Sequence, residues 1–117
     1  MNIIDRIDEW MVDVDIESLQ KHIKKYGDLI AASAEQIYHA LDKQIKKPSK
    51  IIGFEFRRDS HKAEITISTT GDAVANDKAI RVVMRDFGYH DGWILAGASY
   101  AITKSNLPQV WHVMRNF

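Results

Sequence analysis

Residues 51–70 read IIGFEFRRDSHKAEITISTT, and the prediction of the fold begins from this stretch. Apolar side chains alternate with polar ones over residues 52–56 and again over residues 63–67, which is the period of a half-buried strand. The polar residues 58–61 between the two runs predict a turn, so the segment is expected to be a β-hairpin. The second run carries polar side chains on its other face, and the sheet is therefore expected to have one face open to water.

Helical periodicity dominates the chain before the hairpin. The apolar residues among the first fourteen positions fall on one side of a first short helix. Residues 16–46 keep nearly one helical phase, and Asp15 is a suitable N-cap. Gly27 interrupts this phase, because glycine disfavours a helix interior by about 1 kcal/mol, and Asp28 can cap a new start. The pattern leaves open one long helix or two, and its continuity favours collinear helices that end before Pro48.

Three further elements are expected after the hairpin. Residues 80–87 have helical spacing, and Gly88 is a natural residue to end that helix. Residues 93–102 are almost entirely apolar and predict a third, well-covered strand. Residues 107–116 favour a short C-terminal helix, with a strand as the alternative. The order of elements predicts an α+β fold with a three-stranded sheet, and the lack of repeats and linkers predicts one domain over 1–117.

The apolar sides of these patterns predict one shared core. Its expected members are Ile52, Phe54, Phe56, Ile65, Ile67, Ile80, Val83, Met84, Phe87 and Leu95.

Composition limits the class of protein. The chain has 117 residues, of which 45% are hydrophobic and 27% charged, as in an ordinary globular domain. The absence of cysteine excludes a disulfide scaffold, a thiolate zinc site and a cysteine nucleophile. The N-terminal stretch lacks the basic start of a secretory signal, and the apolar run from Trp93 to Tyr100 is too short to cross a bilayer. A cytoplasmic protein without a membrane partner is expected.

Charge is distributed unevenly along the chain, although the formal net charge is +0. Residues 1–20 hold six carboxylates and one arginine, for a net −5, whereas residues 21–62 hold ten basic and five acidic residues, for a net +5. A basic segment of this kind is compatible with phosphate binding, so a nucleic-acid regulator is the first alternative function. Its contact residues would include Lys43, Lys46, Lys47, Arg57 and Arg58.

The turn after the helix predicted over residues 80–87 is the candidate partner-binding surface. Tyrosine and tryptophan anchor many interfaces, and a turn bracketed by Gly88 and Gly92 is expected at the surface. The outward acidic residues of the first helix would steer a charged partner. The predicted surface consists of Tyr89, His90, Asp91 and Trp93 together with Asp5, Asp8 and Glu9.

The sequence contains no complete catalytic motif. His90 beside Asp91 is the type of pair that serves as a general base, which makes a small enzyme the second alternative. Glu35, His39 and Asp42 share a helix face, but nearby lysines repel a cation, so neither a metal nor another cofactor is expected. We therefore expect a small non-enzymatic protein that binds another protein, such as a toxin-neutralising immunity protein or a phage-encoded inhibitor.

Overall fold

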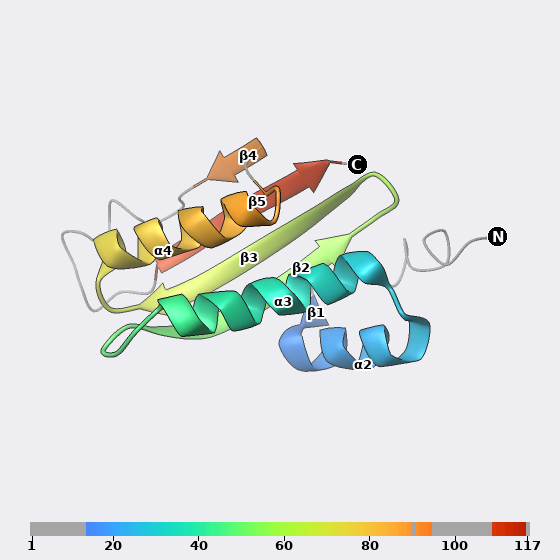
Figure 1. Cartoon of the computed structure of the whole chain (residues 1–117), viewed down its shortest axis with the longest axis horizontal. Helices are drawn as coiled ribbons and strands as arrows, with labels where there is room; N and C mark the ends of the chain where they lie inside the picture. Colours follow the sequence, from blue (N-terminus) through green and yellow to red (C-terminus); the bar gives the residue numbers. More distant parts are fainter. Residues whose placement is uncertain (1–13, 90, 95–108, 117) are drawn as a thin grey trace.

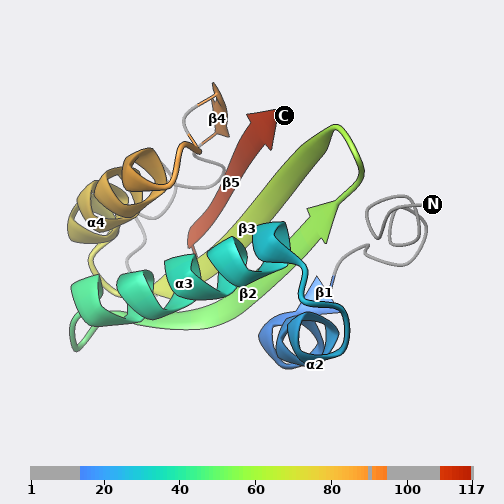
Figure 2. The same ribbon diagram turned by 45° about the vertical axis from the view of Figure 1, so that its right-hand side comes forward.

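A computed structural model of the chain describes residues 14–89, 91–94 and 109–116 (Figure 1), and the structural statements below concern these residues. The fold is α+β, with α3 and α4 lying across one face of an antiparallel sheet and α2 packed beside α3 (Figures 1 and 2). In chain order the elements are β1 (Val14–Asp15), α2 (Ile16–Tyr26), α3 (Leu29–Gln44), β2 (Lys50–Arg58), β3 (Lys62–Thr70), α4 (Ala73–Asp86), β4 (Asp91–Ile94) and β5 (Gln109–Asn116). None of the described helices is long and apolar enough to cross a membrane.

The predicted hairpin is confirmed. Strands β2 and β3 pair antiparallel, with Phe56 opposite Ile65, and their turn spans residues 59–61. Asp59 closes this turn by accepting hydrogen bonds from the backbone N–H groups of His61 (2.7 Å) and Lys62 (2.9 Å). The buried residues of β3 alternate with half-buried polar ones, and the described helices cover only the apolar side of the sheet.

The sheet is larger than the three strands expected from the sequence. Its order is β1-β2-β3-β5-β4, and every neighbouring pair is antiparallel. The third strand predicted over residues 93–102 corresponds to β4, of which the described part ends at Ile94, and residues 95–102 lie outside the described residues. Strand β5 separates β3 from β4, so it occupies a position that the hairpin alone does not specify.

The short C-terminal helix expected for residues 107–116 is wrong, and the strand alternative is confirmed from Gln109 onward. The buried residues Gln109, Trp111 and Val113 alternate with more exposed neighbours, as in a strand with one covered face. The helical spacing seen in the sequence is overridden because β5 is paired along both edges, to β3 and to β4. Such pairing satisfies the backbone on both sides, and β-propensity depends on this context more than on the isolated segment.

Residues 16–44 form two helices that are not collinear, so the preference for collinear helices is wrong. Gly27 adopts a left-handed conformation (φ 64°) at the end of α2, and Asp28 caps α3. Figure 2 shows α2 nearly end-on while α3 runs along the sheet. The first short helix lies mostly outside the described residues, except that Val14 belongs to β1 and pairs with Phe56.

One hydrophobic core joins the helices to the sheet, and most of its predicted members are present. Phe54, Phe56, Ile65, Ile67, Ile80, Val83 and Met84 are buried, and Phe87 packs against them. Ile52 is the exception, because it is 49% exposed. A β-bulge between Ile51 and Gly53 shifts the alternation by one residue, so Ile51 packs toward the core and Ile52 does not. Leu95 lies outside the described residues.

A buried polar cluster fixes the end of the sheet where β2 and β5 begin. Gln109 Oε1 accepts hydrogen bonds from Asn76 Nδ2 (2.8 Å) and from the Thr69 hydroxyl (2.9 Å), and Gln109 Nε2 donates to the Gly71 carbonyl (2.9 Å). Ser49 Oγ accepts a hydrogen bond from the backbone N–H at the N-cap of α4 (3.0 Å). Gly71 makes this approach possible, because a Cβ there would lie 2.6 Å from Ser49 Cα. The connection between α3 and β2 is therefore held firmly against α4.

Candidate functional site

Tyr89 is a core residue and not the exposed anchor expected from the sequence. Its side chain is 1% exposed. Gly88 (φ 80°) ends α4, and the Tyr89 N–H turns back to donate to the Met84 carbonyl (2.8 Å). In this type of helix ending, the residue after the glycine commonly packs against the last turn of the helix. The glycine followed by an apolar residue was the sequence signal for this burial.

The remaining residues of that predicted surface stay a prediction. Asp91 and Trp93 lie in β4, on the edge of the sheet. His90 and the acidic residues Asp5, Asp8 and Glu9 lie outside the described residues. Because Tyr89 is buried, it cannot contribute to that predicted surface.

Tyr89 lies near two arginines on the covered face of the sheet. Arg58 and Arg115 are both cross-strand neighbours of Ala63, one on each side. Burial raises the pKa of Tyr89 to about 12, and the positive charges of Arg115 and Arg58 only partly oppose this effect. Among the residues that the structure describes, no group accepts or donates a hydrogen bond at the Tyr89 hydroxyl. The hydroxyl is therefore held in its neutral form.

The raised pKa predicts a loss of stability in alkali. The folded state keeps the phenolic proton of Tyr89, whereas the unfolded chain releases it near the ordinary pKa of 10.0. The contribution of this difference to the free energy of unfolding is therefore complete below pH 10.0 and is lost as the pH rises toward about 12. We expect Tyr89→Phe to remove this pH dependence while leaving stability at neutral pH unchanged or slightly higher. Urea unfolding of both proteins across this pH range measures the difference. Parallel stability curves for the two proteins would contradict the prediction.

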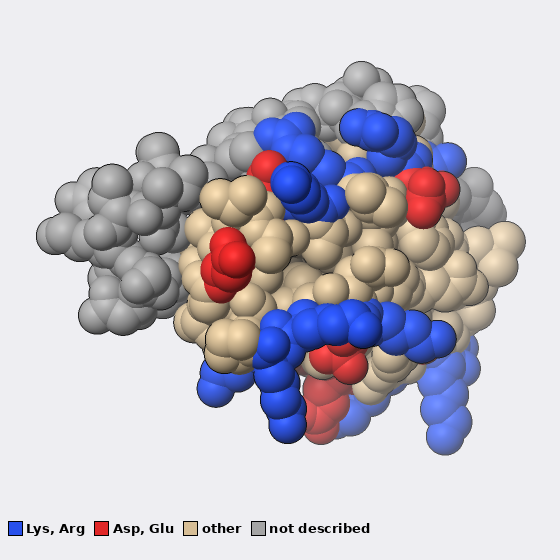
Figure 3. Space-filling model, turned by 60° about the vertical axis from the view of Figure 1, so that its left-hand side comes forward, with Lys and Arg blue, Asp and Glu red and all other residues tan. Residues whose placement is uncertain are grey.

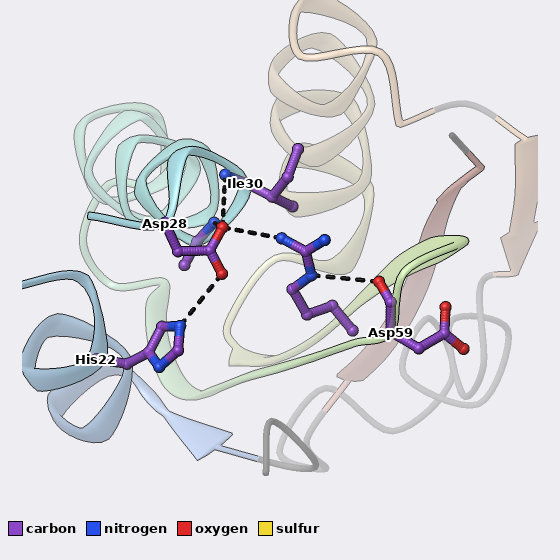
Figure 4. A network of polar contacts seen from close by, with 6 residues as sticks. His22, Asp28, Ile30 and Asp59 are labelled. Atoms are coloured by element: carbon purple, nitrogen blue, oxygen red, sulfur yellow. Dashed lines mark hydrogen bonds and ion pairs between the residues drawn. The ribbon is translucent and has the colours of Figure 1, made fainter. Parts of the chain in front are cut away.

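Arg58, expected to contact phosphate, is buried in a polar network with Asp28 and His22 (Figure 4). Arg58 Nη1 donates to Asp28 Oδ1 (2.8 Å), and Arg58 Nε donates to the Asp59 carbonyl (3.3 Å). The other oxygen of Asp28 lies 3.1 Å from His22 Nε2. Asp28 Oδ1 also caps α3, because it accepts from the backbone N–H groups of Ile30 (3.1 Å) and Ala31 (3.4 Å).

This network joins α2, α3 and β2 and has a structural role. A histidine next to a carboxylate is the arrangement used in general base catalysis, but such a base must reach the proton that it removes. The side chains of His22 and Asp28 are 0% and 3% exposed, so a substrate cannot contact them. The sequence identified Asp28 as a cap but carried no signal for Arg58, which lies 30 residues away.

The other predicted phosphate contacts lie mainly at the opposite end of β2 from Arg58. We define the lysine end as Lys43, Lys46, Lys47 and Lys50, which are all exposed around the connection between α3 and β2. None of these four lysines forms an ion pair with a carboxylate in the described part of the chain. Lys43 lies in the last turn of α3, where a positive charge also interacts favourably with the helix dipole. The lysine end is thus a positive surface on a firmly held turn, and the exposed carboxylates in this region are Asp42, next to Lys43, and Asp72, whose backbone is bound to Ser49.

Several other cations of the basic middle segment lie beside carboxylates or are buried, whereas Lys24 and Lys25 on α2 are exposed and form no ion pair with a described carboxylate. Glu64 lies 3.6 Å from Arg57 Nε and 3.2 Å from Lys62 Nζ, and Lys21 lies 3.6 Å from Glu17. The predicted phosphate contacts therefore do not form one continuous stripe. Figure 3 shows Lys and Arg side chains along two separate borders of one face, with Asp and Glu side chains beside them and mostly uncharged residues between the borders.

Glu35, His39 and Asp42 do not form a metal site. Within residues 14–89, 91–94 and 109–116, no three histidine, aspartate or glutamate side chains converge closely enough to hold a metal ion.

The comparisons with known proteins identify no relative: no family model, no curated protein and no solved structure matches the chain. Function must therefore be inferred from the residues themselves.

Proposed function

We propose that this domain is a non-enzymatic module that binds an acidic protein partner at its lysine end. The observation that supports this proposal is the contrast between four exposed lysines that form no ion pair with a described carboxylate and the paired or buried state of Arg57, Arg58 and Lys62 at the other end of β2. Local positive charge of this kind attracts a negative surface and raises the rate of association. The contacts of Ser49 and Gly71 hold the turn that carries these lysines.

A protein partner fits this arrangement better than a nucleic acid. Binding along a duplex uses cations spaced along the backbone, whereas single strands are held by exposed aromatic rings. Arg58 is unavailable and Arg57 lies at the far end of β2, so the cations are confined to a small area. Among the described aromatic residues, Tyr26 is exposed, but it lies at the end of α2 and not in the connection that carries the lysine end.

An inhibitor is the concrete form of this proposal. A toxin-neutralising immunity protein or a phage-encoded inhibitor blocks its target by binding, and it needs no chemistry of its own. The burial of His22 and Asp28 supports a role without catalysis at that pair.

Charge reversal at the lysine end is expected to weaken partner binding. In K43E/K46E/K47E we expect affinity at about 50 mM salt to fall by roughly tenfold to a hundredfold, mainly through slower association, and the difference from the parent to shrink at high salt. The matched control is K21E/K24E/K25E, which changes the net charge equally on α2. Affinity capture from the native host, with and without nuclease, identifies the partner, and binding kinetics of the purified pair measure the effect.

Two outcomes would contradict the proposal. Capture that disappears after nuclease treatment would assign the lysine end to a nucleic acid. Equal binding by both triple variants would place the contact surface elsewhere.

A further inference from the structure

Strand β2 has an outer edge that is only partly paired. Of its nine residues, Glu55 and Phe56 pair with the two-residue strand β1, because the chain turns into α2 at Ile16. Toward the lysine end, residues 50–54, apart from the bulged Ile52, pair with β3 on one side and with no described strand on the other. Figures 1 and 2 show β1 and α2 beside the half of β2 that leads into the hairpin, while the other half runs past them.

The backbone of this free edge can accept another strand. An unpaired strand edge presents a row of N–H and C=O groups, and proteins use such edges to bind extended peptides by main-chain hydrogen bonds. The bulge leaves Ile52 49% exposed within this segment, which offers an apolar contact next to the backbone groups. The edge therefore combines general backbone recognition with one apolar anchor.

Charge selects the occupant. Lys50 begins the free edge, and Lys46 and Lys47 precede it in the exposed turn. An extended segment with aspartate or glutamate at the end that lies beside Lys50 is attracted by these lysines, whereas the exposed Glu55 at the other end of the free edge disfavours acidic residues there.

We infer that the free edge of β2 over residues 50–54 binds an extended acidic segment of a partner protein as an added β-strand. This inference rests on the proposed function and specifies how its partner is recognised. The lysine end supplies the attraction, and the backbone of β2 supplies the geometry.

The test uses a short peptide of alternating valine and glutamate as the probe, with the full chain as the receptor. We expect NMR titration to shift the backbone amides of residues 50–54 and hydrogen exchange to slow at the newly bonded ones. The variant K43E/K46E/K47E should lower the affinity for the peptide by roughly tenfold or more at low salt, whereas K21E/K24E/K25E should leave it unchanged. Peptide shifts centred on another element would overturn the inference.

A second peptide separates strand addition from simple charge attraction. It has the same sequence but is methylated on every backbone nitrogen, so it keeps its charges and loses its main-chain donors. Loss of these hydrogen bonds is expected to reduce affinity by roughly tenfold or more. Equal binding by the two peptides would overturn strand addition and leave the proposed function standing. The proposed function is tested separately, by capture of the native partner with the lysine variants and with nuclease.

Discussion

Replacing Asp28 by alanine is expected to destabilise the domain by about 3–5 kcal/mol, because it removes the carboxylate that a buried arginine and a buried histidine share. The side chain of Arg58 is 0% exposed, so solvent cannot replace the lost partner without opening the structure. The same substitution removes the N-cap of α3. A small domain has a total stability of about 5–15 kcal/mol, so the loss is a large fraction of it. Urea unfolding followed by circular dichroism measures the change.

Asp72 provides a matched control for the Asp28 prediction. It caps α4 by accepting from the backbone N–H groups of Val74 (3.1 Å) and Ala75 (3.2 Å), but it is exposed. Asp72→Ala should therefore show the cost of a lost cap, about 1 kcal/mol. Asp28→Asn keeps an oxygen for capping and removes the charge, so its stability should lie between those of Asp28→Ala and the parent. If Asp28→Ala costs no more than Asp72→Ala, the network contributes nothing beyond the cap.

Replacing Trp111 by alanine is expected to cost about 3–5 kcal/mol as well, since truncating a buried aromatic side chain removes burial and leaves a cavity. Trp111 is fully buried on β5, opposite Ile67 of β3, and belongs to the central part of the sheet. The substitution thus tests whether the C-terminal segment is a core strand. Thermal and urea unfolding report the loss directly.

His112 is the control for Trp111 because it is the next residue on the same strand. It is exposed on the opposite face, where its Nδ1 lies 2.9 Å from the Thr66 hydroxyl oxygen. We expect His112→Ala to change stability by no more than about 1 kcal/mol. Similar losses from the two substitutions would contradict the one-sided burial of β5.

Elements with local signals could be predicted from the amino-acid sequence. Alternation over residues 52–56 and 63–67 located the hairpin, and Gly88 marked the end of α4. Asp15 and Asp28 were identified as caps, and both accept backbone hydrogen bonds in the structure. These features were predictable because they depend on groups within a few residues of each other. For the candidate site, the sequence placed Lys43, Lys46 and Lys47 close together in one basic segment.

Which side chains of that segment are available to a partner depends on tertiary contacts that the sequence does not reveal. Arg57 and Arg58 are neighbours in sequence, yet one is exposed beside Glu64 and the other is buried against Asp28. Tyr89 follows Gly88 in a sequence typical of a turn, yet it packs into the core next to the end of α4. Residues 109–116 match a helix by spacing, but two neighbouring strands make them a strand. In each case the outcome is set by partners distant in sequence, because hydrogen bonding and burial depend on which elements the fold brings together, and local periodicity carries no information about that choice.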